Sequence, residues 1–108
     1  MNKKEIDTLI SERFFGWEVK GYNGYDHPFV NKDGMDRSPF SPSTDINHAW
    51  RVVEKLKNCG LEVAIYTDTE KSTCHIIDAS SSLLAVWGAD AETACLAICH
   101  ATIKMISS

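Results

Sequence analysis

The sequence predicts an α+β domain in which helices cover both faces of a mainly antiparallel sheet of three to four strands. Apolar residues recur at helical spacing in three segments, near residues 3–15, 45–59 and 91–106. Between the second and third segments, short stretches of alternating or continuous apolar residues are typical of strands. The expected order is therefore helix, short strand or loop, helix, strand, strand, strand, helix.

The first helix is expected over residues 3–15. Its apolar stripe comprises Ile6, Leu9, Ile10 and Phe14. The polar face is expected to carry Lys4, Glu5, Asp7, Ser11 and Glu12. Gly16 is a natural helix terminator, and the alternating residues 17–20 fit a short strand.

Residues 21–43 are predicted to form a long loop. This stretch contains all three prolines of the chain, three glycines and a scatter of Asn, Asp and Ser. It also contains aromatic residues, which disordered segments usually lack. Long loops in compact domains are commonly functional. Two interpretations are open: the aromatic side chains anchor the loop to the core, or part of the loop lines a ligand site.

The second helix is expected over residues 45–59, with Ser43 or Thr44 as its cap and Asp45 in its first turn. Its apolar stripe comprises Ile46, Ala49, Trp50, Val53 and Leu56. After Gly60, residues 61–66 and 72–78 are expected to form a hairpin.

The apolar run over residues 83–87 predicts a central strand that is covered on both faces. The last helix is expected over residues 91–106, capped by Asp90. It is apolar over most of its circumference, so it must be buried on more than one side. In so small a domain, we expect its second side to contact another copy of the chain, giving a homo-oligomer.

Composition limits the classes of function. The 108 residues fit a single domain, and the net charge of −4 disfavours a nucleic-acid partner. No stretch approaches the roughly 20 apolar residues of a membrane span, and the N-terminus has no signal-peptide pattern. We therefore expect no membrane partner and a cytoplasmic location.

The four cysteines are expected to be thiols, which a reducing compartment favours. Cys95 and Cys99 share a helix face and could bind zinc together with His75 or His100. However, the chain has no CxxC pair, which favours small apolar fillers and predicts no metal site.

Three phrases resemble the phage ABA sandwich domain family. They are LISERFFGW at residues 9–17, FSPSTDINHAWRVVEKL at residues 40–56 and AETACLAICHA at residues 91–101. The resemblance spans the chain and implies a small phage or prophage protein with an α/β/α sandwich, acting in an infected or lysogenic bacterial host. It implies no established activity. The chain departs from the family pattern at Cys95, often Pro, and at His100, often Arg, which weakens any anion-binding role for the last helix.

No enzyme motif is present: there is no GxSxG elbow, phosphate-binding loop or GxGxxG fingerprint. The pairs Asp26-His27 and Asn47-His48 are isolated in sequence. The sequence therefore predicts no catalytic residue and no cofactor.

A binding hypothesis remains. The predicted loop ends at the N-terminus of the second helix, where free N–H groups and the helix dipole favour anions. For a small anionic, nucleotide-like ligand, the expected contacts are Arg37, Arg51, Ser43 and Thr44, with stacking by Tyr25 or Phe40. One alternative is that the cations are solvated and the aromatic residues pack. A second hypothesis is a protein–protein interaction or structural module with an apolar oligomer surface.

Overall fold

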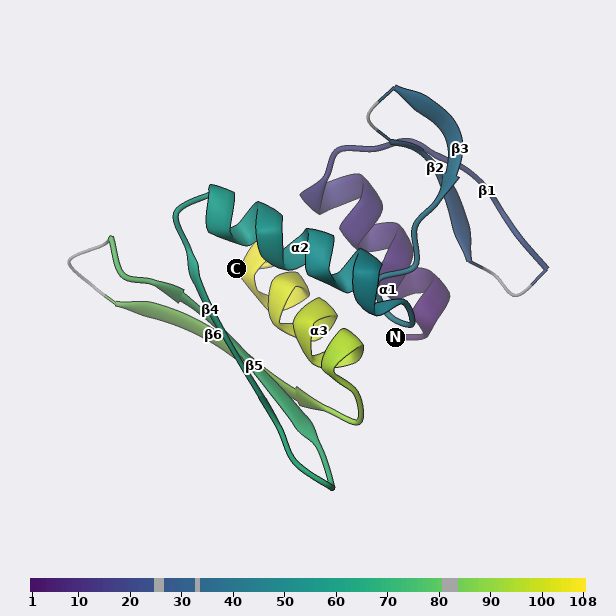
Figure 1. The fold of residues 1–108 in the computed structure, drawn as a ribbon. Coiled ribbons are helices and arrows are strands. Elements are labelled where there is room, and N and C mark those ends of the chain that lie inside the picture. Colours follow the sequence, from purple (N-terminus) through teal and green to yellow (C-terminus); the bar gives the residue numbers. More distant parts are fainter. Residues whose placement is uncertain (25–26, 33, 81–83) are drawn as a thin grey trace.

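The computed structural model describes residues 1–24, 27–32, 34–80 and 84–108, and it places three helices between two small sheets (Figure 1). The sheets have the strand orders β1-β2-β3 and β4-β5-β6, and every pairing is antiparallel. In chain order the elements are α1 (Lys3–Leu9), η1 (Ile10–Phe14), β1 (Val19–Tyr22), β2 (Pro28–Lys32), β3 (Met35–Pro39), α2 (Ile46–Asn58), β4 (Glu62–Thr67), β5 (Ser72–Asp78), β6 (Ala85–Ala91) and α3 (Ala94–Ile106).

An α+β sandwich with antiparallel strands is therefore confirmed. The structure differs from the expectation in how the layers are stacked. Instead of one sheet between helices, the helices lie between two sheets (Figure 1). Helix α3 packs on β5 and β6, whereas the opposite face of that sheet carries exposed side chains such as Tyr66 and Val86.

The long loop predicted over residues 21–43 is wrong, because the described part of this segment contains most of the β1-β2-β3 sheet. The strands have four or five residues each. Pro28 begins β2 and Pro39 ends β3, positions where a missing N–H costs little. The register shifts between Val19 and Gly21 and between Val30 and Lys32. Apolar and polar residues therefore do not alternate regularly along these strands, and the sequence shows no strand pattern there.

The first helix forms where expected, but its last turn is a five-residue π-helix, and Gly16 follows at φ +71°. Two residues assigned to its polar face, Asp7 and Ser11, are instead buried. Ser11 Oγ donates to the Asp7 carbonyl oxygen at 2.7 Å, as serines often do within a helix.

Helix α2 confirms the second predicted helix, with a different cap. Asp45 is the N-cap residue, and its Oδ1 accepts from the backbone N–H groups of Asn47 at 2.9 Å and His48 at 3.4 Å. The expectation that Ser43 or Thr44 caps this helix is wrong.

The hairpin of β4 and β5 is confirmed, but the predicted central strand is wrong. The central strand is β5, and β6 is an edge strand that continues through Gly88 to Ala91. Residue 83 of the predicted run lies outside the described residues. Leu84 and Val86 are exposed because only one face of this sheet is covered by a helix.

Helix α3 begins after Thr93, whose side chain caps it, whereas the expected cap Asp90 lies in β6. The helix is enclosed by elements of its own chain. β5 and β6 lie on one side, and α1, η1 and α2 lie on the other. Ala97, Ile98 and Cys99 are fully buried. The apolar circumference of α3 is thus satisfied within one chain and needs no second copy.

Candidate ligand site

Two aspartate side chains of the protein itself occupy the hydrogen-bond donors at the N-terminal end of α2. Ser43 donates its backbone N–H to Asp7 Oδ1 and its hydroxyl to Asp7 Oδ2, both at 2.9 Å. Asp45 accepts the free N–H groups of the first turn of α2. The donors expected to bind a ligand anion at Ser43 are therefore occupied. The Thr44 N–H donates to the Ser41 carbonyl oxygen at 3.1 Å.

Phe40 cannot stack on a ligand, because its ring is fully buried. Its ring centroid lies 5.2 Å from that of Phe15 and 5.0 Å from that of Trp17, both edge to face. The expectation of a stacking role for Phe40 is wrong. The other expected stacking residue, Tyr25, lies outside the described residues.

The two expected arginines lie against different aromatic rings. Arg37 is an exposed residue of β3 whose guanidinium carbon is 5.8 Å from the Phe29 ring centroid. The guanidinium carbon of Arg51, on α2, lies 5.6 Å from the Trp17 ring centroid. The structure thus does not place Arg37, Ser43 and Phe40 together as one site, but it gives Arg51 an aromatic partner.

A hollow on the outer side of α2 combines cations with aromatic rings. Phe15 and Trp17 are stacked, with centroids 4.2 Å apart and planes 16° apart. Lys55 Nζ lies 5.3 Å from the Phe15 centroid, and Arg51 covers Trp17. The hollow has a volume of about 410 Å³. It is lined by Phe15, Trp17, Arg51, Glu54, Lys55 and Asn58.

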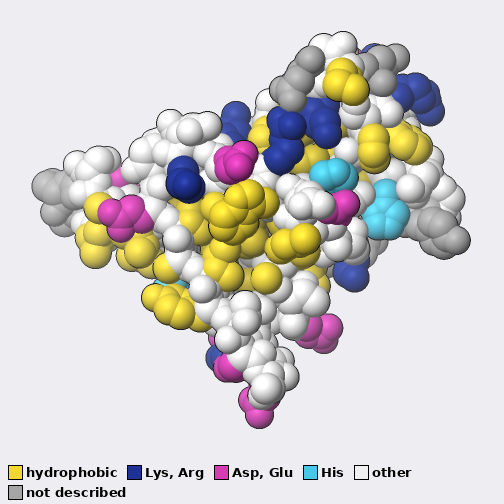
Figure 2. Space-filling view, viewed as in Figure 1, with side chains coloured by type: hydrophobic (Ala, Val, Ile, Leu, Met, Phe, Trp, Pro, Cys, Tyr) yellow, Lys and Arg dark blue, Asp and Glu magenta, His cyan; other side chains and the backbone are white. Residues whose placement is uncertain are grey.

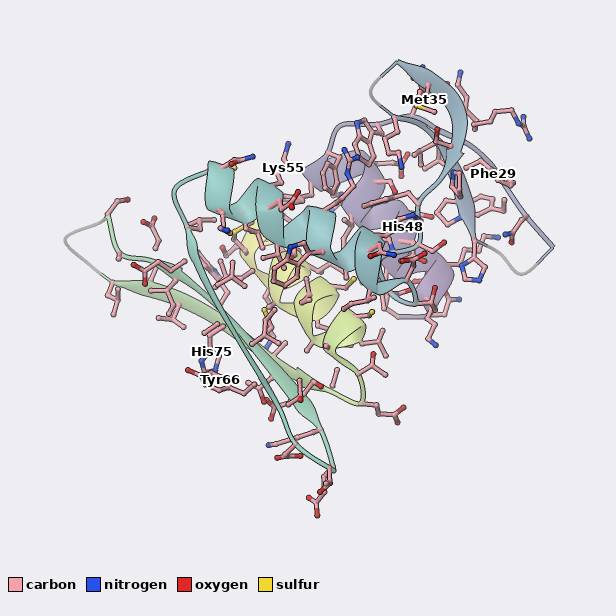
Figure 3. All side chains as sticks on the ribbon, viewed as in Figure 1. Phe29, Met35, His48, Lys55, Tyr66 and His75 are labelled. Atoms are coloured by element: carbon pink, nitrogen blue, oxygen red, sulfur yellow. The ribbon has the colours of Figure 1, made fainter. Side chains whose placement is uncertain are left out.

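The local charge of this hollow is opposite in sign to that of the whole chain. Two of its lining residues are cations and one, Glu54, is an anion, whereas the chain has a net charge of −4. Lysine and arginine side chains gather on this side of α2 (Figure 2), and Lys55 projects from α2 away from the β4-β5-β6 sheet (Figure 3). We refer to these six residues as the cationic hollow.

The family comparison covers most of the chain. Residues 8–103 match the family model described as Phage ABA sandwich domain. The chain belongs to the phage ABA sandwich domain family. No curated protein and no solved structure matches this phage ABA sandwich domain.

Sequence reasoning missed four of the six residues that line the cationic hollow in this phage ABA sandwich domain, namely Phe15, Glu54, Lys55 and Asn58. Lys55 is not among the ligand contacts expected from the sequence. Its spacing of four from Arg51 places both on one face of a helix, which could have identified it. Phe15 was assigned to the helix end, although it lies two residues from Trp17.

The structure also brings together two histidines that are isolated in sequence. His27 Nδ1 lies 2.8 Å from Ser41 Oγ, and the Ser41 N–H donates to His48 Nδ1 at 2.9 Å. Ser41 is 7% exposed, so its hydroxyl is enclosed rather than presented to a substrate. Burial lowers the pKa of His48, which keeps Nδ1 free to accept this bond. Asp26, the sequence neighbour of His27, lies outside the described residues.

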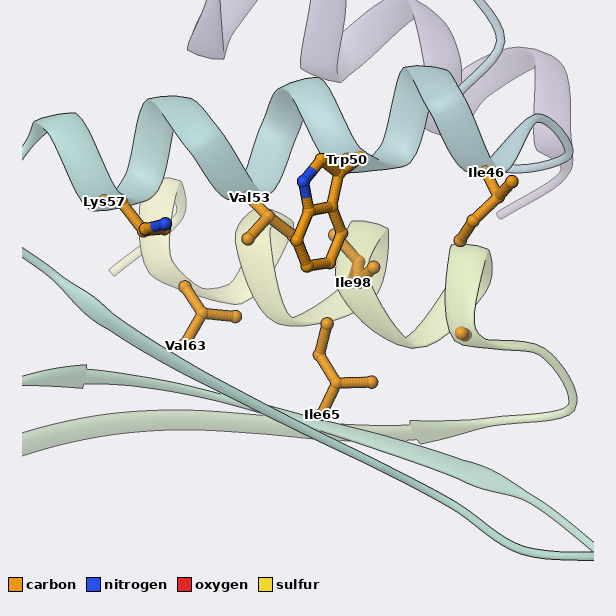
Figure 4. A pocket seen from close by; sticks show the side chains of 8 residues that line it. Ile46, Trp50, Val53, Lys57, Val63, Ile65 and Ile98 are labelled. Carbon is orange, nitrogen blue, oxygen red and sulfur yellow. The ribbon is translucent and has the colours of Figure 1, made fainter.

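A second, apolar hollow lies between α2 and β4 (Figure 4). It has a volume of about 530 Å³. Ile46 and Trp50 of α2 form its upper wall and are about half exposed, at 52% and 49%. Val63 and Ile65 of β4 form the wall below them. We refer to this hollow as the α2–β4 groove.

Two further features of the part of the chain that the structure describes are the grouping of its metal-ligating side chains and the length of its apolar helices. There, no three or more His, Cys, Asp or Glu side chains gather so that they could hold a metal ion. Cys95 and Cys99 are buried thiols, and burial raises the pKa of Cys99 well above its usual value. None of the described helices is sufficiently long and apolar to span a bilayer.

Proposed function

We propose that this phage ABA sandwich domain is a non-enzymatic phage accessory protein that binds a small nucleotide-like ligand in the cationic hollow. The observation that carries the proposal is the placement of Arg51 and Lys55 against the stacked rings of Phe15 and Trp17. Its place of action is the cytoplasm of an infected or lysogenic host. Holding a nucleotide signal of host defence without converting it would protect the phage.

The chemistry of the lining residues supports binding. A planar base gains dispersion energy and cation–π contacts beside an indole and a guanidinium. Phosphate oxygens gain charge-assisted hydrogen bonds from Arg51 and Lys55, each contributing roughly 1.5–3 kcal/mol. The six lining residues include no histidine, cysteine or serine, and their one carboxylate, Glu54, is adjacent to Lys55 in α2, so these two side chains do not face each other as a base and a nucleophile would. This composition favours retention of a ligand over its conversion.

Calorimetric titration tests this function with a panel of purine and pyrimidine nucleotides, and with adenosine and inorganic phosphate as partial ligands. We expect a nucleotide to bind more tightly than either partial ligand. Because each cation contributes separately, Arg51→Ala and Lys55→Ala should each weaken binding by about tenfold or more.

Lys57→Ala is the matched control, because Lys57 lies on the same helix but lines the α2–β4 groove. It should leave nucleotide affinity unchanged. The proposal is wrong if no nucleotide binds, or if binding survives the loss of both Arg51 and Lys55.

A second candidate function is a protein–protein interaction or structural module that acts through an apolar surface. The half-exposed Ile46 and Trp50 beside Val63 and Ile65 favour it, because soluble monomers rarely leave such side chains together at the surface. Trp50→Ala distinguishes the two functions. It should abolish an interaction at the groove while leaving nucleotide binding in the cationic hollow intact.

A further inference from the structure

The outer edge of β4 carries backbone groups that point away from the sheet. The Asp68 N–H donates to the Lys71 carbonyl oxygen at 2.9 Å, which closes the β4–β5 turn. Because bonded and non-bonded pairs alternate in an antiparallel ladder, Glu62, Ala64 and Tyr66 are bonded to β5. The N–H and C=O groups of residues 63, 65 and 67 therefore point outward. No described residue forms a hydrogen bond with these outward groups.

The other edge of the same sheet is protected. On β6, the outward carbonyl oxygen of Gly88 accepts a hydrogen bond from Lys104 Nζ at 2.6 Å. Lys104 lies on α3, so it brings a positive charge to this edge, and charged side chains at a sheet edge oppose strand addition. On β6 the Gly88 carbonyl oxygen is the outward group that a described side chain bonds, whereas on β4 no outward group is bonded by a described residue.

The space beside β4 fits an added strand. The α2–β4 groove lies next to this edge, with Trp50 above Ile65 and Val53 above Val63 (Figure 4). Because strand side chains alternate between faces, every second side chain of an added strand would enter the groove beneath Trp50. Backbone hydrogen bonds would supply affinity and the groove would select apolar side chains.

We propose that the occupant is β4 of a second copy of the chain, paired antiparallel about a two-fold axis to form one six-stranded sheet. Strand β4 has the pattern such an occupant needs, because Val63 and Ile65 face the groove and alternate with Ala64 and Tyr66 on the open face. An antiparallel two-fold pairing puts the helices of both copies on the same side of the sheet. Both copies of Trp50 and Ile46 then cover the joined strands.

Charge disfavours one of the registers that this pairing could take. With Val63 opposite Ile65 of the partner subunit, Ala64 lies at the two-fold axis and Glu62 is opposite an uncharged Tyr66. Shifting the register so that Ile65 faces its own copy would place Glu62 opposite Asp68, and like charges directly opposite are destabilising. The first register therefore joins apolar to apolar side chains without opposing carboxylates.

Charge reversal at Ala64 tests the proposal. Sedimentation equilibrium of the full chain is expected to give a concentration-dependent mass that approaches twice 12.0 kDa. Ala64→Lys and Ala64→Glu each place like charges opposite each other at the axis, so each should weaken dimerisation by at least about tenfold. An equimolar mixture of the two variants should restore the dimer.

This mixture also shows that both variants remain folded, because only folded strands can pair. Val86→Lys is the matched control, since Val86 is an exposed residue on the same face of β6. It should leave the dimer unchanged. A mass of 12.0 kDa at every concentration would overturn the proposal. So would a dimer that Ala64→Lys and Ala64→Glu leave intact, since that result assigns the contact to another surface.

Discussion

The carboxylate of Asp7 accepts two hydrogen bonds from Ser43, one from its backbone N–H and one from its hydroxyl, each 2.9 Å long. The two residues are 36 positions apart, so this pair joins α1 to the turn that precedes α2. Asp7 is 1% exposed. Burial raises its pKa, although the bonds from Ser43 and the charges of His27 and Lys3 act in the opposite direction.

Asp7→Asn is expected to become increasingly stabilising relative to wild type as the pH rises from acid to neutral. Because the pKa of Asp7 is raised in the folded protein, its contribution to the free energy of unfolding is complete below the unfolded pKa of 3.8. That contribution declines as the pH rises through the folded pKa. Asparagine avoids this loss, since its oxygen can accept from the Ser43 N–H while its amide donates to the hydroxyl. Urea unfolding of both proteins across this pH range measures the difference.

Asp7→Ala is the control for this prediction, because it removes the acceptor and leaves both Ser43 donors buried. It should lower the free energy of unfolding by about 1–3 kcal/mol. If Asp7→Asn instead lost stability relative to wild type as the pH rose, the carboxylate would have a lowered pKa and the prediction would fail.

Acid is expected to weaken the contact between Ser41 and His48. The pKa of His48 is lowered from 6.5 by burial, assisted by Lys32 and Arg51 and opposed by Asp45. The contribution of His48 to the free energy of unfolding is therefore complete above pH 6.5, and it is lost as the pH falls through the lower pKa of the folded state. His48→Asn keeps an acceptor near Nδ1 without a titrating ring. It should reduce the loss of stability with falling pH, as measured by thermal unfolding at a series of pH values.

The assignment of the His48 effect can be checked directly. A titration of the His48 ring followed by NMR should give a midpoint below 6.5. An equal acid sensitivity in the His48→Asn protein would attribute the effect to another group, such as His100, whose pKa is also lowered by burial.

Phe40 should matter for stability and Arg37 should not. Phe40 is fully buried between Phe15, Trp17 and His48, so Phe40→Ala should cost about 3–5 kcal/mol in the free energy of unfolding. Arg37→Ala changes an exposed side chain and should stay within about 0.5 kcal/mol of wild type. Denaturant unfolding of both variants gives the comparison. A Phe40→Ala protein as stable as wild type would show that this ring is not part of the core.

The sequence was most informative where one physical signal dominates. Helix α2 has a continuous apolar stripe and a terminating Gly60, and its bounds were predicted almost to the residue. The β1-β2-β3 sheet has short, shifted strands that start or end at prolines, so its residues have the composition of a loop.

The site was predicted only in part for a different reason. Asp7 was assigned to a polar face because its residue type favours water, and its partner Ser43 is too distant in sequence for any local pattern to connect them. Arg51 is among the ligand contacts expected from the sequence, and Trp17 begins the segment expected as a short strand. Their contact requires the end of η1 to lie beside α2, which is a tertiary relationship.

Removing the side chain of Lys104 is expected to allow the β6 edge to pair with a strand of another molecule. Lys104 Nζ bonds to the outward carbonyl oxygen of Gly88, and its charge also opposes the approach of another strand. Because the β4 edge pairs with a second copy in the proposed dimer, Lys104→Ala leaves the β6 edge of each copy available for further pairing. Two open edges allow pairing to continue from molecule to molecule, so the variant should form species larger than a dimer as its concentration rises. Lys104→Arg keeps a charged donor and should behave as wild type. Light scattering coupled to size exclusion distinguishes these outcomes. An unchanged mass for Lys104→Ala at all concentrations would show that Lys104 does not prevent strand pairing at the β6 edge.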